Sequence, residues 1–598
     1  MFFTNFHPMT SEEVNKKVIA SPKAETKLES TPLLSGKEIN FNFEGEHKPE
    51  KLSYKFNSSF TLDINENGNE FKDVPYNALS LNERIVLFTH LIPGTSRGWH
   101  IIVDLQSGLA TAFETWFGIS VPVGGDLTGQ RPPSHHREIP REVQRQYHFG
   151  WVDAGRDKPE KLHTTTNRLE GKGLYWKNNE GNRWLSFFPS VVCSTTVHLD
   201  APRDTTIITY PSDYIRISEK YYIYAKWGVE FGGEMHLYVL DIGELKAIGF
   251  KFGFNDKDDF EYNMYSAELV ITGDAAHLEK IGDGGDKEAP MPMVLARGKG
   301  GRYAYRPRDV DVPLTKEEVI EAVKTKRIFE SGGSNIMMSS NRLPFSYDLV
   351  GKPFSLNFDH VETPFAWSAG NMPEKLITNY EYEFIDKEKL KWREAGGSWQ
   401  EEKYTCFNPA KGIYFFSHML TGHSQYASVA QAVDISTGLA TCIFARIGSW
   451  RSDWEAGCTC LFGTAKGEGI AKPHFSQRHG FTNDLLGHSY AWAYSDSSAS
   501  IHVYGAPRSY SWSIFQPNNS GGATWSSPGF FIKLREDAYL LQWIEENCNG
   551  GHSIVCFNPR IMQDSGFFYN VNKHTGLGLN IFGGHARKLG SFDIAKYF

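Results

Sequence analysis

A block of polar and aromatic residues near the C-terminal end of the chain has the residue types needed for proton transfer. The stretch SASIHVYGAPRSYSWSIF, at 498–515, contains His502, Tyr504, Tyr510 and Trp512. Residues two apart on a strand share a face, so His502 and Tyr504 can point into one interior together. Burial moves the pKa values of such groups and lets them act as acid and base. We therefore predict catalytic roles for His502 and Tyr504, with Tyr510 and Trp512 against the substrate.

The following stretch, YLLQWIEENCNGGHSIV at 539–555, adds a carboxylate and further rings to this candidate site. It supplies Tyr539, Trp543, Glu545 and His552. A carboxylate next to a histidine and a phenol completes a plausible acid–base set, so Glu545 is the third predicted catalytic residue. Tyr539, Trp543 and His552 are predicted to contact the substrate. The alternative is that all of these are interior residues with satisfied hydrogen bonds.

A second group of titratable residues lies in the first part of the chain and is a rival site. Four of its members are predicted to bind a substrate: Glu114, Trp116, His100 and His148. Others of this group are His90, Arg137 and Tyr147. This region is the alternative to the C-terminal site.

The chain repeats itself, which shows how these residues are positioned. VDLQSGLAT at 103–111 returns as VDISTGLAT at 433–441. Other segments recur in the same order, namely LSGKEINFNFEG as LVGKPFSLNFDH, RIVLFTHL as GIYFFSHM, and HTTTNRLEGKGLYW as HGFTNDLLGHSYAW. A duplication with insertions in loops explains this order. His163 and His479 match across the copies, as His236 and His552 do approximately.

The two copies differ where chemistry would occur. His502, Tyr504 and Trp512 correspond to Ser186, Phe188 and Thr196, whereas Glu114 and Trp116 correspond to Phe444 and Arg446. We therefore expect unequal interiors, with the working site in the C-terminal part of the second copy.

Short alternating or apolar segments separated by turn residues predict a mainly β fold. INFNF, RIVLFTHL and GWHIIVDL read as strands, and DLQSG and DISTG read as tight turns between strands. Meanders of this kind remove their edges by closing into antiparallel barrels, two per copy and about four in all. Capped helices are expected at 10–20 and 315–329. The predicted domains are 1–160, 161–275, a linker or long loop at 276–314, 315–478 and 479–598.

Composition excludes several classes of protein. The net charge of −8 and the lack of a basic run argue against binding of nucleic acid. No apolar run is long enough to span a membrane, and the start does not resemble a secretory signal. Seven cysteines without framework spacing indicate free thiols, so we predict a cytoplasmic protein. A homodimer is left open.

Several short motifs do not carry the chemistry that they suggest. GTSRG at 94–98 precedes a strand rather than a helix, so it predicts a hairpin turn and not a nucleophile elbow. CTC at 458–460 has no second cysteine pair at zinc spacing. SHHRE at 134–138 lies in a Pro-rich loop, where we expect it to be solvated rather than to bind a metal. GKGGRY at 298–303 lacks the context of a P-loop or of a dinucleotide-binding motif. We expect no metal and no cofactor.

The L-x-G-K strand, the SGLAT hairpin, YHFGWVD and the block LLGHSYAWAYSD…IHVY…YSW resemble the molybdenum cofactor biosynthesis protein F (MoaF-like) family. The resemblance covers most of the chain, twice over. It implies an N-terminal and a C-terminal calycin or lipocalin-like β-barrel in each copy. The C-terminal lobe also looks like phenolic acid decarboxylases, which are small barrels that perform acid–base chemistry without a metal. A fold hosts many functions, so the site must carry the functional argument.

These observations lead to a functional hypothesis with two rivals. We expect a lyase or isomerase that decarboxylates, dehydrates or cyclises an apolar aromatic or polyketide-like metabolite in a barrel. The first rival is a non-catalytic, lipocalin-like carrier of small hydrophobic molecules. The second is a scaffold for another protein.

Overall fold

A computed structural model of the chain describes most of its 598 residues. The described residues are 9–45, 48–118, 141–155, 158–190, 193–201, 206–227, 234–255, 257–276, 327–328, 338–363, 376–423, 427–447, 456–495, 498–515, 524–545, 551–572 and 576–598. The chain divides into two compact units. Unit 1 contains 1–304 and 591–598, and unit 2 contains 305–590.

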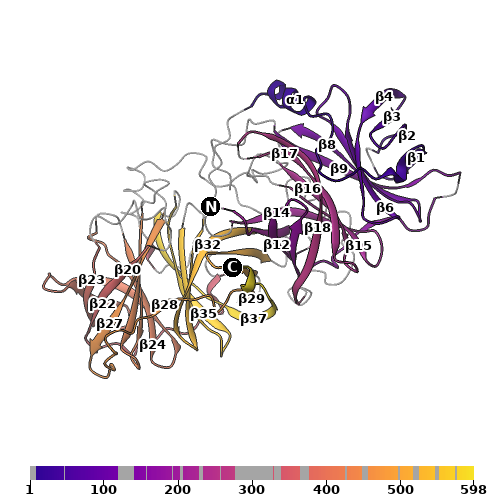
Figure 1. Cartoon of the computed structure of the whole chain (residues 1–598). Coiled ribbons are helices and arrows are strands. Elements are labelled where there is room, and N and C mark those ends of the chain that lie inside the picture. The colour runs from indigo at the N-terminus through magenta and orange to yellow at the C-terminus, as the bar shows by residue number, and fades with distance from the viewer. Residues whose placement is uncertain are drawn as a thin grey trace. The chain divides into compact units, whose positions relative to one another are not determined.

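Unit 1 begins with a capped helix and an antiparallel sheet that we call barrel 1 (Figure 1). Helix α1 spans Ser11–Ile19, and the Thr10 hydroxyl accepts from the Glu13 N–H, so the first expected helix is confirmed. The sheet order β4-β3-β2-β1-β9-β8-β7-β6-β5 has consecutive strands at its two ends, so the barrel is nearly closed. Its strands are β1 (Glu38–Phe43), β2 (Leu52–Phe56), β3 (Thr61–Glu66), β4 (Asn69–Pro75), β5 (Asn77–Ser80), β6 (Ile85–Leu91), β7 (Gly98–Asp104), β8 (Leu109–Gly118) and β9 (Glu142–Val152).

Barrel 2 completes unit 1, and its meander closes where β11 pairs with β18. Its strands are β10 (Thr164–Thr165), β11 (Lys172–Asn178), β12 (Arg183–Ser190), β13 (Cys193–His198), β14 (Thr206–Arg216), β15 (Tyr221–Trp227), β16 (Met235–Asp241), β17 (Lys246–Phe254) and β18 (Phe260–Ala275). Residues 591–598 also pack here. The Phe592 ring lies 4.9 Å from Phe187, and Tyr597 stacks on Tyr175 at 4.2 Å.

Barrel 3 opens unit 2 and is a closed barrel of consecutive strands (Figure 1). Its strands are β20 (Phe354–Glu362), β21 (Asn379–Phe384), β22 (Lys389–Glu394), β23 (Gln400–Ala410), β24 (Ile413–Met419), β25 (Ser428–Asp434), β26 (Leu439–Ile447) and β27 (Ala456–Gly467). One long strand, β23, pairs with both β22 and β24 and takes the place of β4 and β5 of barrel 1. The second expected helix, at 315–329, lies outside the described residues except at Arg327–Ile328. Those two residues form β19 and pair in parallel with β36, so the helix prediction is wrong there.

Barrel 4 is the last strand group, and β29 pairs with β37 to bring its ends together. Its strands are β28 (Gly480–Phe481), β29 (His488–Ser495), β30 (Ser498–Ala506), β31 (Ser509–Phe515), β32 (Thr524–Arg535), β33 (Ala538–Glu545), β34 (Gly551–Asn558), β35 (Gln563–Asn572), β36 (Gly576–Phe582) and β37 (His585–Phe592). The mainly β prediction, with antiparallel barrels in tandem, is confirmed.

Burial explains why some strands alternate and others are continuously apolar. In β3 every second residue is buried, because one face meets the barrel interior and the other meets solvent. In β6, β15, β24 and β30 every residue is buried. The second face of β6 and β15 packs between barrels 1 and 2, and that of β24 packs between barrels 3 and 4. Neighbouring residues on such strands therefore lie in different environments.

Candidate functional sites

The interior of barrel 4 collects most of the residues predicted for the C-terminal site. Ser500, His502 and Tyr504 alternate along β30, and all three are buried. The His502 ring lies 5.0 Å from Tyr510 and 6.3 Å from Trp543, measured between ring centres. The apolar lining consists of Leu485, Tyr490, Trp492, Tyr494, Tyr504, Tyr510, Trp512, Phe531, Tyr539, Leu541, Trp543, Val555, Phe557 and Phe582.

Four of these side chains form a continuous hydrogen-bonded chain. Tyr494 Oη lies 2.9 Å from Ser500 Oγ, which lies 3.0 Å from His502 Nε2. On the other side of the ring, His502 Nδ1 lies 3.3 Å from Tyr504 Oη. Every link joins groups that can donate or accept, so a shift in one proton can pass along the chain.

Burial keeps this chain uncharged at neutral pH. It lowers the pKa of His502 to about 3, because the imidazolium would lose its hydration. Burial also raises the pKa of Tyr504 well above its usual value. The pair therefore presents a neutral imidazole beside a phenol.

A buried carboxyl group, Asp564, was missed by the sequence analysis. It follows the turn before β35 and pairs with Phe557, which places it on the interior face of barrel 4. Its Oδ1 accepts from the Gly584 N–H at 2.7 Å. Burial raises the pKa of Asp564 to about 7, and its charge contributes to the raised pKa of Tyr504. Asp564 is therefore poised to exchange a proton near neutral pH. In the sequence, the alternation of residues in DSGFF was the only signal that Asp564 faces an interior.

The remaining predicted residues of this region lie in three different places. Trp512 is interior, and its Nε1 donates to Ser527 Oγ at 2.9 Å. Tyr539 is buried, and its hydroxyl donates to Asp484 Oδ2 at 3.0 Å. Glu545 ends β33, and its side chain lies outside the described part of the structure.

His552 does not face the interior of barrel 4, so its predicted place is wrong. Trp543 pairs with Ser553, which turns His552 to the opposite face of β34. There His552 Nε2 lies 3.3 Å from Gln542 Oε1, and Gln542 donates to Cys460 Sγ of barrel 3 at 3.0 Å. The same register aligns His236 with Ser553 rather than with His552. His552 therefore belongs to the packing between barrels 3 and 4.

Barrel 1 contains an ion triad that includes the predicted residue Glu114. Arg97 donates to Glu114 at 2.8 Å and to Glu66 at 2.7 Å, and Trp99 Nε1 donates to Glu66 at 2.8 Å. His148 lies inside the same barrel, 6.0 Å from the Trp99 ring centre. The half-buried Trp116 follows Glu114 by two residues on β8. Because Arg97 binds both carboxylates, this group is a partly exposed salt-bridge triad.

His100 also lies in the wrong place for the predicted site. It faces away from the interior of barrel 1 and stacks on Phe250 of barrel 2 at 4.3 Å. Its Nε2 lies 2.8 Å from Thr115 Oγ1, and its Nδ1 contacts Thr89 Oγ1. His100 therefore helps to pack barrels 1 and 2 together. His90 is interior and lies 3.0 Å from Tyr54 Oη, as His418 does from Tyr382 Oη in barrel 3.

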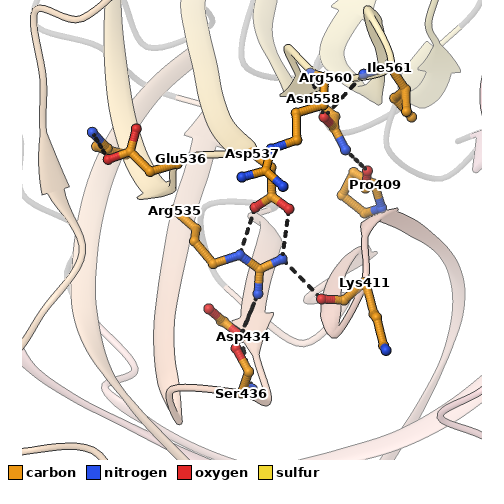
Figure 2. Close-up of polar contacts among 11 residues, drawn as sticks. Pro409, Lys411, Asp434, Ser436, Arg535, Glu536, Asp537, Asn558, Arg560 and Ile561 are labelled. Carbon is orange, nitrogen blue, oxygen red and sulfur yellow. Dashed lines mark hydrogen bonds and ion pairs between the residues drawn. The ribbon is translucent and has the colours of Figure 1, made fainter.

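The repeated nonamer forms a strand, a tight turn and the next strand, as predicted, and it lies where the two barrels of each unit meet. Gly108 and Gly438 take φ values of 74° and 72° in the turns. In unit 2, Arg535 of barrel 4 reaches Asp434 Oδ1 at 3.4 Å and the Lys411 carbonyl at 3.0 Å (Figure 2). In unit 1, Arg84 of barrel 1 binds the equivalent Asp104 through Nε at 2.7 Å. The carboxylate is the same in both copies, but its cation comes from a different barrel.

Arg446 is a buried cation of barrel 3 whose guanidinium nitrogens have no hydrogen-bond partner in the described part of the chain. The side chain is 0% exposed and lies on β26 where the first copy has Trp116. Sequence comparison identified this exchange but not the burial.

The remaining motifs lie in a turn, in a strand or outside the described residues. GTSRG is the turn between β6 and β7, where Ile92 N–H donates to the Arg97 carbonyl at 2.8 Å. CTC lies on the buried strand β27. Among the described residues, no three His, Cys, Asp or Glu side chains converge as a metal-ligand group. SHHRE, Arg137 and GKGGRY lie outside the described residues.

No helix within the described ranges is both long and apolar enough to cross a membrane.

The fold and the buried polar interiors define a tandem protein of antiparallel β-barrels. Residues 334–449 match the MoaF N-terminal domain, and residues 479–591 match the MoaF C-terminal domain. The second copy is therefore similar to the two domains of the MoaF family. A comparison with curated proteins gave no match.

Proposed function

We propose that barrel 4 is the reaction chamber of a lyase or isomerase that acts on a small aromatic or polyketide-like metabolite. The observation that supports this proposal is the hydrogen-bonded chain from Tyr494 through Ser500 and His502 to Tyr504, surrounded by aromatic rings. The chemistry would be decarboxylation, dehydration or cyclisation, each of which needs a proton delivered to one substrate atom and removed from another.

Each group has a role that follows from its state at neutral pH. Tyr504 remains a phenol and donates a hydrogen bond or a proton to a substrate oxygen. Neutral His502 restores that proton through its ring nitrogens. Asp564 takes the acid–base role that the sequence suggested for Glu545, because its pKa of about 7 lies near the working pH. Tyr510, Trp512 and Trp543 form the apolar walls.

The test is turnover in deuterium oxide with a panel of phenolic acids and aromatic ketones. NMR would detect both the product and deuterium at the carbon that gains a proton. We expect Tyr504→Phe and His502→Phe to lower turnover by about 10²–10⁴-fold, the usual effect of losing a positioned acid–base group. Ser186→Ala changes the equivalent position of barrel 2 and should leave turnover within about twofold. Full activity in His502→Phe would overturn the assignment.

The rival function is a non-catalytic carrier, which the aromatic lining of barrel 4 favours by itself. A carrier would quench tryptophan fluorescence on binding but would incorporate no deuterium into its ligand. Tight binding without exchange or product across the panel would therefore support the carrier and contradict the enzyme.

A further inference from the structure

Barrel 2 has an interior of a different chemical kind from that of barrel 4. His502 pairs with Trp512, and the equivalent Ser186 pairs with Thr196. Trp543 pairs with Ser553, and the equivalent pair in barrel 2 is Lys226 with His236. Two tryptophans of barrel 4 are thus replaced by Thr196 and Lys226. The first copy has therefore lost the His502 set but carries a polar set of its own, which the sequence comparison did not reveal.

Lys226 is enclosed by this set. Its side chain is 1% exposed, and Nζ donates to Thr196 Oγ1 at 2.7 Å. The same nitrogen lies 4.3 Å from the centre of the Tyr210 ring. An ammonium group has three N–H donors, and one hydroxyl and one ring face replace little of its hydration. These contacts suit a neutral amine.

The nearest acid is engaged by a different lysine. Glu234 binds Lys251 Nζ at 2.8 Å, and Lys251 also binds Glu261 at 2.5 Å. Glu234 is also 3.3 Å from His236 Nε2. Lys226 has no salt bridge to a carboxylate among the described residues. The titratable groups that face it are His198, Tyr210, Glu234, His236 and Lys251.

These surroundings shift the pKa values of the two buried lysines in opposite directions. Burial lowers the pKa of Lys226 to about 7. For Lys251 burial acts in the same direction, but Glu234 and Glu261 outweigh it and raise the pKa. At neutral pH a large fraction of Lys226 is therefore nucleophilic, whereas Lys251 stays protonated.

Hydroxyl groups beside Lys226 can hold a carbonyl oxygen. Ser212 pairs with Lys226 across β14 and β15. Ser212 Oγ lies 2.8 Å from Ser194 Oγ, which lies 2.6 Å from Tyr224 Oη. Lys226 is the last residue but one of β15, which places it near the end of the barrel. Aromatic rings line the rest of the interior, among them Trp176, Trp184, Tyr214 and Tyr238.

We propose that Lys226 is a nucleophilic amine that forms an imine with a small aromatic aldehyde or ketone inside barrel 2. Nζ adds to the carbonyl carbon and makes a C–N bond. The C–O bond of the resulting carbinolamine then breaks. The oxygen leaves as water with the two hydrogens of the amine, and a C=N bond remains. This site is separate from the proposed site in barrel 4.

The test is reductive trapping of the full-length protein at pH 7 with benzaldehyde and sodium cyanoborohydride. Reduction converts the imine into a stable secondary amine, which peptide mass spectrometry assigns to a residue. We expect Lys226 to be modified at least about tenfold faster than the exposed Lys177, because its lowered pKa leaves a large fraction of its amine neutral at pH 7. Lys251 should remain unmodified, and it serves as the buried control in the same sample.

Two further measurements keep the result decisive. The rate at Lys226 should reach half its maximum near pH 7. Protein unfolded in urea should lose the preference for Lys226. A native rate at Lys226 equal to or below that at Lys177 would overturn the proposal, and so would equal modification of Lys226 and Lys251. Lys226→Arg should abolish the modified peptide without changing circular dichroism.

Discussion

Thr441 Oγ1 and His479 Nδ1 lie 2.8 Å apart, and the bond joins the hairpin of barrel 3 to the segment that leads into barrel 4. Thr111 and His163 make the same contact at the same distance in unit 1. Both threonines are the last residue of the repeated nonamer. The last residue of the nonamer therefore connects the two barrels of each unit through His163 or His479.

This contact predicts a measurable coupling between the two side chains. Thr441→Val removes the partner of a buried ring nitrogen and should lower the free energy of unfolding by about 1–3 kcal/mol. His479→Phe in the Thr441→Val background should cost less than His479→Phe alone, because the contact is already lost. Urea denaturation of the four proteins gives the coupling energy. Strictly additive effects would contradict the proposed role of the bond.

Acid should destabilise the protein between about pH 6.5 and pH 4. Burial lowers the pKa to about 4 for His90, His163, His236, His418 and His479. The unfolded state binds these protons first, since its histidines titrate near pH 6.5, so stability is lost as the pH falls. Urea midpoints at pH 7, 6 and 5 should fall steadily, and a constant midpoint would refute the prediction.

Asp564 should oppose this loss of stability at low pH. Its pKa of about 7 is higher than that of an unfolded aspartate, so the folded state gains stability from it as the pH falls from 7 to 4. Asp564→Asn removes that contribution and should make the fall of the urea midpoint steeper. An unchanged slope would mean that Asp564 is not protonated in the folded protein near pH 6.

Removing the cation beside Asp434 should destabilise unit 2. Asp434 is 0% exposed, and Arg535 is the cation that binds it (Figure 2). Arg535→Met leaves a buried carboxylate unpaired and should cost about 3 kcal/mol. Asp434→Asn in the same protein should restore part of the loss. Arg183→Met breaks the exposed pair with Asp200 and should cost under about 1 kcal/mol.

Arg446→Met should stabilise the protein or leave its stability unchanged. The substitution replaces a buried cation that has no hydrogen-bonded acceptor in the described residues with an apolar side chain of similar length. Thermal unfolding measures the effect. Arg141→Met is the matched control and should destabilise, because Arg141 donates to the Asn255 carbonyl at 2.9 Å and binds Asp258. A loss of more than about 2 kcal/mol in Arg446→Met would contradict the prediction.

Periodicity along one strand was sufficient to predict that His502 and Tyr504 share the interior of a barrel. Alternation fixes relative orientation within a strand, and β30 contains both residues. It does not fix orientation across a turn. His552 was grouped with Trp543 although the register between β33 and β34 places them on opposite faces. His100 was misplaced because β7 is buried on both faces, so a polar residue on it gives no sign of which side it occupies.

Asp564 and Lys226 show a second limit of sequence reasoning. Each is the single charged residue of its strand, and charged residues are usually exposed. Their burial depends on the residues that they pair with on neighbouring strands. Asp564 pairs with the interior residue Phe557, and Lys226 pairs with the buried residue His236. The comparison of the two copies singled out neither position.

Residues 591–598 complete unit 1 although they follow unit 2 in the sequence. Phe592 covers Phe187, and the Asp593 N–H donates to the Thr272 carbonyl at 2.8 Å. A nascent chain that has emerged only as far as residue 304 therefore lacks part of its own unit. Unit 1 cannot reach its final state before residues 305–590 have been synthesised. A cut in the gene between the two copies would therefore leave unit 1 without residues 591–598.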